Sequence, residues 1–109
     1  MISNYGNDKG GGAYDSLLFS CLLTNNSSTA GGGVFGCRVE HSTLRANTGG
    51  WSGGAADGGS FVDHCLIETN KAQVGGGLNV STGINCMIVG NGGWRGAGAH
   101  ASELRHCTV

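Results

Sequence analysis

The chain has 109 residues, a net charge of −1 and only 12% charged residues, which is the size of one domain without a basic surface for nucleic acid. Residues 1–12 contain no apolar signal-peptide core, and no apolar run is long enough to span a membrane. We therefore expect no nucleic-acid partner and no membrane insertion, and any export signal would lie outside this chain.

Glycine-led segments recur along the chain at nearly constant spacing. They start near Gly10, Gly31, Gly54, Gly75 and Gly96, at intervals of 21, 23, 21 and 21 residues. Each is followed by a small residue and, except at Gly83, an aliphatic residue. The first four continue into the pattern C-x-Φ-x-x-N, in which Φ is aliphatic and the cysteine is once a serine, and the chain ends within the fifth copy. Such agreement predicts a repeat protein in which stacked units share one continuous core.

Apolar and polar residues alternate with a period of two within each unit, which is the pattern of a β-strand. The glycine segment, the small-x-Φ segment and the C-x-Φ segment predict three short strands per coil, separated by turns. We therefore predict an all-β chain: a parallel β-helix of about five coils, forming a single segment over residues 1–109.

Stacking the coils turns each repeated position into a column. An asparagine column at a turn is expected to hydrogen-bond from coil to coil, with the asparagines themselves in left-handed geometry; it contains Asn26, Asn47, Asn70 and Asn91. A second, inward column holds Cys21, Ser42, Cys65, Cys86 and Cys107. In-register parallel strands give poor disulfide geometry, so these cysteines are expected to be free, core-filling thiols.

The spacing leaves one irregular coil and two unusual ends. Six residues separate Asn47 from Gly54, where the other coils have four, so a single insertion is expected after Asn47. Ile2 and Val109 occupy the same position of the repeat, which leaves both ends uncapped. Uncapped ends predict either a fragment of a longer protein, which we favour, or end-to-end association of copies.

The units resemble those of large bacterial surface proteins with right-handed parallel β-helix repeats. The resemblance rests on Gly10-Gly11-Gly12-Ala13-Tyr14 followed by Cys21-Leu22-Leu23-Thr24-Asn25-Asn26, and the GGA and xxN elements are also similar to chlamydial polymorphic outer membrane protein repeats. It implies an extracellular or cell-surface location and a scaffold or adhesive role. We also expect no cofactor.

Ionisable residues gather just before the cysteine column. Glu40 and Asp63 are expected to stack in neighbouring coils, with His41 and His64 beside them. Paired carboxylates with His64 could serve a glycoside hydrolase or polysaccharide lyase, or hold a hard cation, and the two imidazoles could share a metal. A solvated charged face with a polar turn column is the alternative, and we expect neither catalysis nor a bound metal.

Two tryptophans follow paired glycines in the turn after the asparagine. Trp51 and Trp94 are expected about 10 Å apart along the solenoid, and Arg95 lies beside the second. Exposed rings on one edge would suit carbohydrate, whereas packing against the adjacent turn is the structural alternative.

The sequence therefore leaves three functions open. A non-catalytic scaffold or adhesin-like segment is favoured, a carbohydrate-binding or carbohydrate-active fragment comes second, and a self-assembling rod from a small mobile reading frame comes third. The expected partners are glycans or further copies of the chain.

Overall fold

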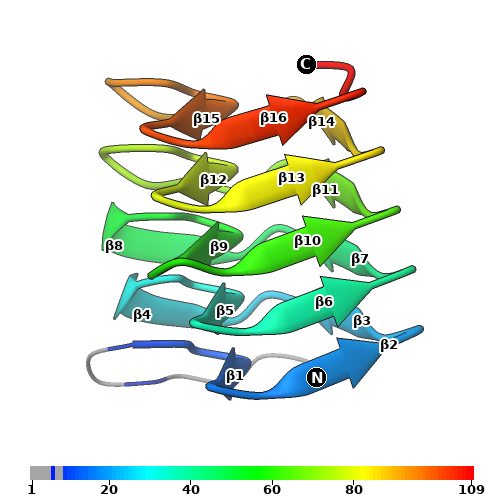
Figure 1. The fold of residues 1–109 in the computed structure, drawn as a ribbon. Helices are drawn as coiled ribbons and strands as arrows, with labels where there is room; N and C mark the ends of the chain where they lie inside the picture. Colours follow the sequence, from blue (N-terminus) through cyan, green and yellow to red (C-terminus); the bar gives the residue numbers. More distant parts are fainter. Residues whose placement is uncertain (1–5, 7–8) are drawn as a thin grey trace.

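The computed structural model describes residue 6 and residues 9–109, and every regular element in this part of the chain is a β-strand. Figure 1 shows the strands stacked in coils, running rightward along the near face and returning behind as the chain climbs, so the winding is right-handed. The described residues complete about four turns, close to the expected five, and confirm the predicted parallel β-solenoid. Ile2 lies outside the described residues.

Three sides of the solenoid are parallel sheets that take one strand from each coil (Figure 1). The first side contains β1 (Ala13–Tyr14), β5 (Val34–Phe35), β9 (Ala56–Asp57), β12 (Leu78–Asn79) and β15 (Ala99–His100). The second side contains β2 (Leu17–Phe19), β6 (Arg38–Glu40), β10 (Phe61–Asp63), β13 (Thr82–Ile84) and β16 (Glu103–Arg105). The third side contains β3 (Leu22–Thr24), β7 (Thr43–Arg45), β11 (Leu66–Glu68) and β14 (Met87–Val89).

A fourth side, which the sequence pattern did not predict, follows the asparagine column. Here β4 (Ser27–Ala30) pairs in parallel with β8 (Thr48–Ser52), and single bridges carry the pairing onward to residues 71–74 and 92–95. The predicted turn after each asparagine is therefore an extended segment that pairs with the next coil. No helix in the described part of the chain could cross a membrane.

The register explains why aliphatic residues recur at two positions of the repeat. Val39 pairs with Val62 on the second side, Leu44 pairs with Ile67 on the third side, and all four side chains are fully buried. These columns form the core between the sheets. Gly83 is the exception on the second side, and a side chain there would meet Leu78, which fills the space from the first side.

The asparagine column is a continuous buried hydrogen-bond ladder. Asn47 Oδ1 accepts the backbone N–H of Asn26 at 3.0 Å and its Nδ2 at 3.1 Å, while Asn47 Nδ2 donates to Leu23 O at 2.9 Å. Asn70 accepts from Asn47 in the same way, at 2.9 and 3.0 Å. The predicted coil-to-coil bonding is thus present in the structure.

The left-handed geometry, however, belongs to the residue before each ladder asparagine. Asn25 has a φ of 56° and Ala46 a φ of 54°, whereas the ladder asparagines do not have positive φ. The expectation that the ladder asparagines themselves adopt left-handed geometry was therefore wrong. The amide is selected because only a side chain with both donors and an acceptor satisfies the ladder.

The irregular coil contains two single-residue insertions instead of the one predicted after Asn47. Val34 pairs with Ala56, 22 residues on, while Arg38 pairs with Phe61, 23 residues on. One extra residue lies in β8, where the register with β4 shifts, and the other lies at the Gly58-Gly59 turn. Gly53, with a φ of 56°, is consequently the coil start that corresponds to Gly31 and Gly75, and the predicted start near Gly54 is one residue late.

A buried carboxylate links the two insertions. Asp57 accepts a hydrogen bond from Ser52 in β8 and another, at 2.6 Å, from the backbone N–H of Gly58. Asn79 Nδ2 in the next coil donates to the same carboxylate at 3.1 Å. Asp57 is only 4% exposed, and these donors supply the hydrogen bonds that a buried carboxylate needs.

Candidate binding surface

The two tryptophans lie in one outward column on the fourth side. Ser52 bridges to Val74 and Val74 bridges to Arg95, so the residues before them, Trp51, Gln73 and Trp94, stand above one another. Val74 N donates to Trp51 O at 3.0 Å and Trp94 N donates to Gln73 O at 2.9 Å. This register places the rings two coils apart, or about 10 Å.

Both rings are open to solvent. Trp51 is 59% exposed and Trp94 is 90% exposed, so neither ring is buried against an adjacent turn. The structural alternative to a binding role for these rings is therefore disfavoured. Aligned exposed aromatic side chains are a feature of interaction surfaces.

Shallow hollows line the fourth side. One, of about 230 Å³, lies among Trp51, Gln73, Val74, Trp94 and Arg95. A second, of about 260 Å³, lies between Trp94 and the backbone of β8, with Lys71 and Gln73 in its wall.

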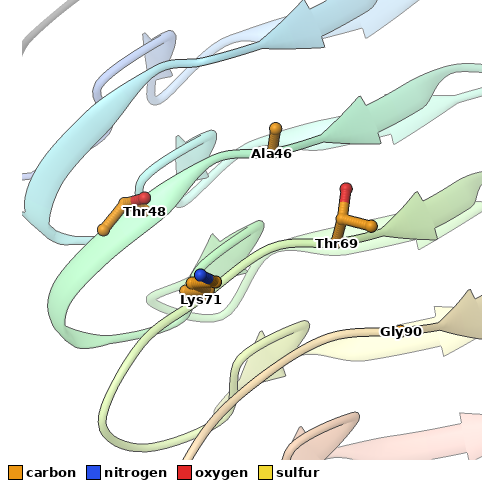
Figure 2. Close-up of a pocket in the computed structure, with 5 residues that line it drawn as sticks. All are labelled: Ala46, Thr48, Thr69, Lys71 and Gly90. Atoms are coloured by element: carbon orange, nitrogen blue, oxygen red, sulfur yellow. The ribbon is translucent and has the colours of Figure 1, made fainter.

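A third hollow, of about 470 Å³, continues this surface around the corner from the third side to the fourth. Its lining consists of Ala46, Thr48, Thr69, Lys71 and Gly90, and Figure 2 shows these residues on three successive coils. Lys71 lines both this hollow and the second, so it joins the corner to the tryptophan column.

The predicted carboxylate pair is adjacent but lies on the second side, away from these hollows. Asp63 in β10 pairs in register with Glu40 in β6. Each carboxylate has its own cation or imidazole: Arg38 lies 3.6 Å from Glu40, and His64 Nδ1 lies 2.7 Å from Asp63. Neither carboxylate lines any of these three hollows.

The two histidines stack face to face in a left-handed corner. The rings of His41 and His64 are 4.9 Å apart with a 20° interplanar angle, and their φ angles are 49° and 50°. Phe19 packs edge-on against His41 at 5.4 Å. Within residues 9–109, no three His, Cys, Asp or Glu side chains are grouped so as to hold a metal. The two imidazole rings form a stacked pair at this corner.

The cysteines carry free thiols that donate to backbone carbonyls. Cys65 Sγ contacts Asp63 O at 3.2 Å, Cys86 Sγ contacts Ile84 O at 3.2 Å, and both side chains are 4% exposed. The Cys86 thiol lowers the pKa of Cys65, whereas Cys65 and burial raise the pKa of Cys86. Cys65 and Cys86 therefore fill the core, while Cys21 and Cys107 at the ends of the column are partly exposed.

Cys37 offers a test of how such a thiol contributes to stability. Burial raises its pKa, so the neutral thiol is favoured in the folded chain, and its contribution is complete below the unfolded value of about 8.5 and is lost as pH rises through the folded pKa. Serine occupies this position in other coils, for example Ser60. Between pH 7 and pH 10, wild type should lose up to about 2 kcal/mol more unfolding free energy in urea than Cys37→Ser. If the pH profiles of wild type and Cys37→Ser were parallel, the thiol would have the same pKa in the folded and unfolded chain, which would contradict this account.

Sequence reasoning found the tryptophans and Arg95 but missed Gln73 and Lys71. Counting back from the expected start at Gly54 places Trp51 opposite Ala72 instead of Gln73. Counting from Gly53, the start that the structure shows, aligns Trp51, Gln73 and Trp94. The sequence therefore allows this alignment, but the two adjacent glycines made the start of the coil ambiguous.

No protein-family model matches this chain, and neither the curated proteins nor the solved structures contain a match.

Proposed function

We propose that this chain is a non-catalytic, adhesin-like β-solenoid segment that binds carbohydrate along its fourth side. The observation that carries the proposal is the outward column Trp51–Gln73–Trp94, held in register by the coils. The proposal is supported by two exposed aromatic faces that have a polar side chain between them.

Sugar rings present apolar C–H faces together with hydroxyl groups, and this column matches both. An indole face can stack on the apolar face of a pyranose, while its N–H remains available as a donor. Gln73 supplies an amide with donors and an acceptor at the midpoint. The spacing of about 10 Å is close to the length of a disaccharide unit in an extended β-1,4-linked chain. A glycan lying along the solenoid axis would therefore stack on both indoles.

The rigidity of the scaffold supports a binding role. The segments that carry Trp51, Gln73 and Trp94 are hydrogen-bonded to one another from coil to coil. Side chains fixed on such a frame lose little freedom when a ligand binds, which favours affinity from a small surface. The resemblance of the repeats to bacterial surface proteins supports an exported, adhesive setting for such a surface.

A catalytic role has weaker support than binding. The closest arrangement to an acid–base pair is Asp63 with His64 at 2.7 Å, beside Glu40, on a side where none of the three hollows lies. We propose that wild-type protein leaves a bound oligosaccharide intact.

Trp94→Ala is the sharpest test of this function. On an array of β-1,4-linked oligosaccharides, the wild-type chain should bind, and Trp94→Ala should weaken binding at least about tenfold because one stacking face is lost. Phe19→Ala is the matched control, since Phe19 is 62% exposed on a different side and should leave binding unchanged. Absence of wild-type binding, or equal loss in the two variants, would remove the proposal.

A further inference from the structure

The basic residues of this chain divide into two groups according to their partners. Three arginines on the second and third sides have carboxylate partners: Arg38 with Glu40 at 3.6 Å, Arg45 with Glu68 at 2.9 Å, and Arg105 with Glu103 at 2.7 Å. The remaining basic residues are Lys9, Lys71 and Arg95, and none has a carboxylate of the described residues within 4.0 Å.

These unpaired cations all lie on the fourth side. Lys9 bridges to Ala30, Lys71 bridges to Thr48, and Arg95 bridges to Val74, so each belongs to a column of that side. The fourth-side segments 27–30, 48–52, 71–74 and 92–95 contain no Asp or Glu. The described acidic residues lie on the other three sides or at their corners, as Glu40, Glu68 and Asp15 do. The charged side chains of these four segments are therefore Lys71 and Arg95, and both are positive.

Two of these cations lie beside the tryptophan column. Arg95 lines the hollow between Trp51 and Trp94, and Lys71 lines the hollow that Gln73 and Trp94 share. Lys9 is already engaged, because its ammonium group lies 4.9 Å from the centre of the Phe35 ring. Lys71 and Arg95 are thus the cations available to a ligand that stacks on the indoles.

We infer that the fourth side prefers acidic oligosaccharides, specifically chains of hexuronic acid, over their neutral counterparts. This inference rests on the proposed carbohydrate binding and names its ligand class. The carboxylate of a hexuronate projects from the ring edge while the ring face stacks on an indole. The Arg95 guanidinium can receive such a carboxylate with two parallel N–H donors, and Lys71 can receive another as a point charge.

The size of the preference follows from the exposure of these cations. Solvent-exposed ion pairs contribute little, so two such pairs predict roughly a fivefold tighter dissociation constant at low salt. The preference should shrink as salt is added, because exposed charges are screened.

The test compares two hexasaccharides that differ only at the C6 position. Calorimetric titration of the full chain with β-1,4-linked mannuronate hexamer and with β-1,4-linked mannohexaose should give roughly fivefold tighter binding of the acidic sugar. The double variant Lys71→Gln/Arg95→Gln should bind the two sugars with equal affinity. Arg38→Gln/Arg105→Gln changes the net charge by the same amount on the second side and should keep the preference.

Each outcome separates the inference from the function on which it rests. Equal binding of the two hexamers by wild type, or a preference that survives in Lys71→Gln/Arg95→Gln, overturns the acidic preference and leaves carbohydrate binding standing. Binding of neither hexamer overturns both. A sulfated mannohexaose forms a third arm, and binding of that sugar in place of the mannuronate hexamer would overturn the assignment to a carboxylate.

Discussion

Asn70→Ala is expected to lower the free energy of unfolding by about 3–5 kcal/mol, a large part of the stability of a domain of this size. Asn70 is fully buried, donates from Nδ2 to Leu44 O at 2.9 Å and to Asn91 Oδ1 at 3.0 Å, and accepts from Asn47 through Oδ1. Alanine removes all of these bonds at once. It also leaves buried groups of Asn47 and Leu44 unpaired, which costs more than the bonds themselves.

Urea unfolding followed by circular dichroism measures this loss. Asn25→Gly is the matched control, because Asn25 is exposed and has a φ of 56°, which glycine adopts without strain. The control should stay within about 1 kcal/mol of wild type. If Asn70→Ala were as stable as the control, the ladder would not be a principal source of stability.

Gly54→Ala is expected to be at least as damaging, for a steric reason. A methyl group at this position would overlap Gly76 O and the backbone of Lys71, both in the next coil. Backbone atoms in a stacked solenoid cannot move aside without separating two coils, so we expect a loss of at least about 3 kcal/mol or failure to fold.

Gly50→Ala provides the control for the steric argument. Its added methyl group would meet only Ser28 O and Thr29 Cα, both at 3.8 Å, which is ordinary contact. Gly50 is exposed, and alanine there should leave the melting temperature unchanged or slightly raised, because the unfolded chain loses freedom. Wild-type melting behaviour of Gly54→Ala in a thermal scan would contradict the close packing of the coils.

The columns of this fold could be predicted from sequence because the repeat is a consequence of stacking. Once coils lie in register, each position faces the same neighbours in every coil, so Leu44 and Ile67 must both be aliphatic, and Asn47 and Asn70 must both be amides. Every repeat obeys this constraint, so the spacing of the repeated residues is enough to predict the columns.

The irregular coil could not be recovered in the same way. Glycine readily adopts left-handed geometry, so the sequence alone does not distinguish Gly53 from Gly54 as the start of the coil. Their roles differ only in three dimensions, where Gly53 has a φ of 56° and Gly54 packs against the next coil. The choice moved the alignment of Trp51 by one residue and hid Gln73 from the candidate site.

The candidate site was only partly predictable for a related reason. Binding residues lie outside the repeat, so periodicity does not identify them, and only their unusual type drew attention to Trp51 and Trp94. Lys71 is ordinary as a residue. Its interest comes from the absence of a carboxylate partner among the described residues, which requires the register of the fourth side.

The most direct test of the proposed binding surface follows the two indole N–H signals of the wild-type chain by NMR during titration with β-1,4-linked mannuronate hexamer. Trp51 and Trp94 are the only tryptophans in the sequence, so each signal reports one end of the column. Binding along the fourth side predicts that both signals shift together with a single dissociation constant, while the His41 and His64 ring signals stay in place. Unmoved indole signals, or shifts confined to the histidine rings, would contradict it.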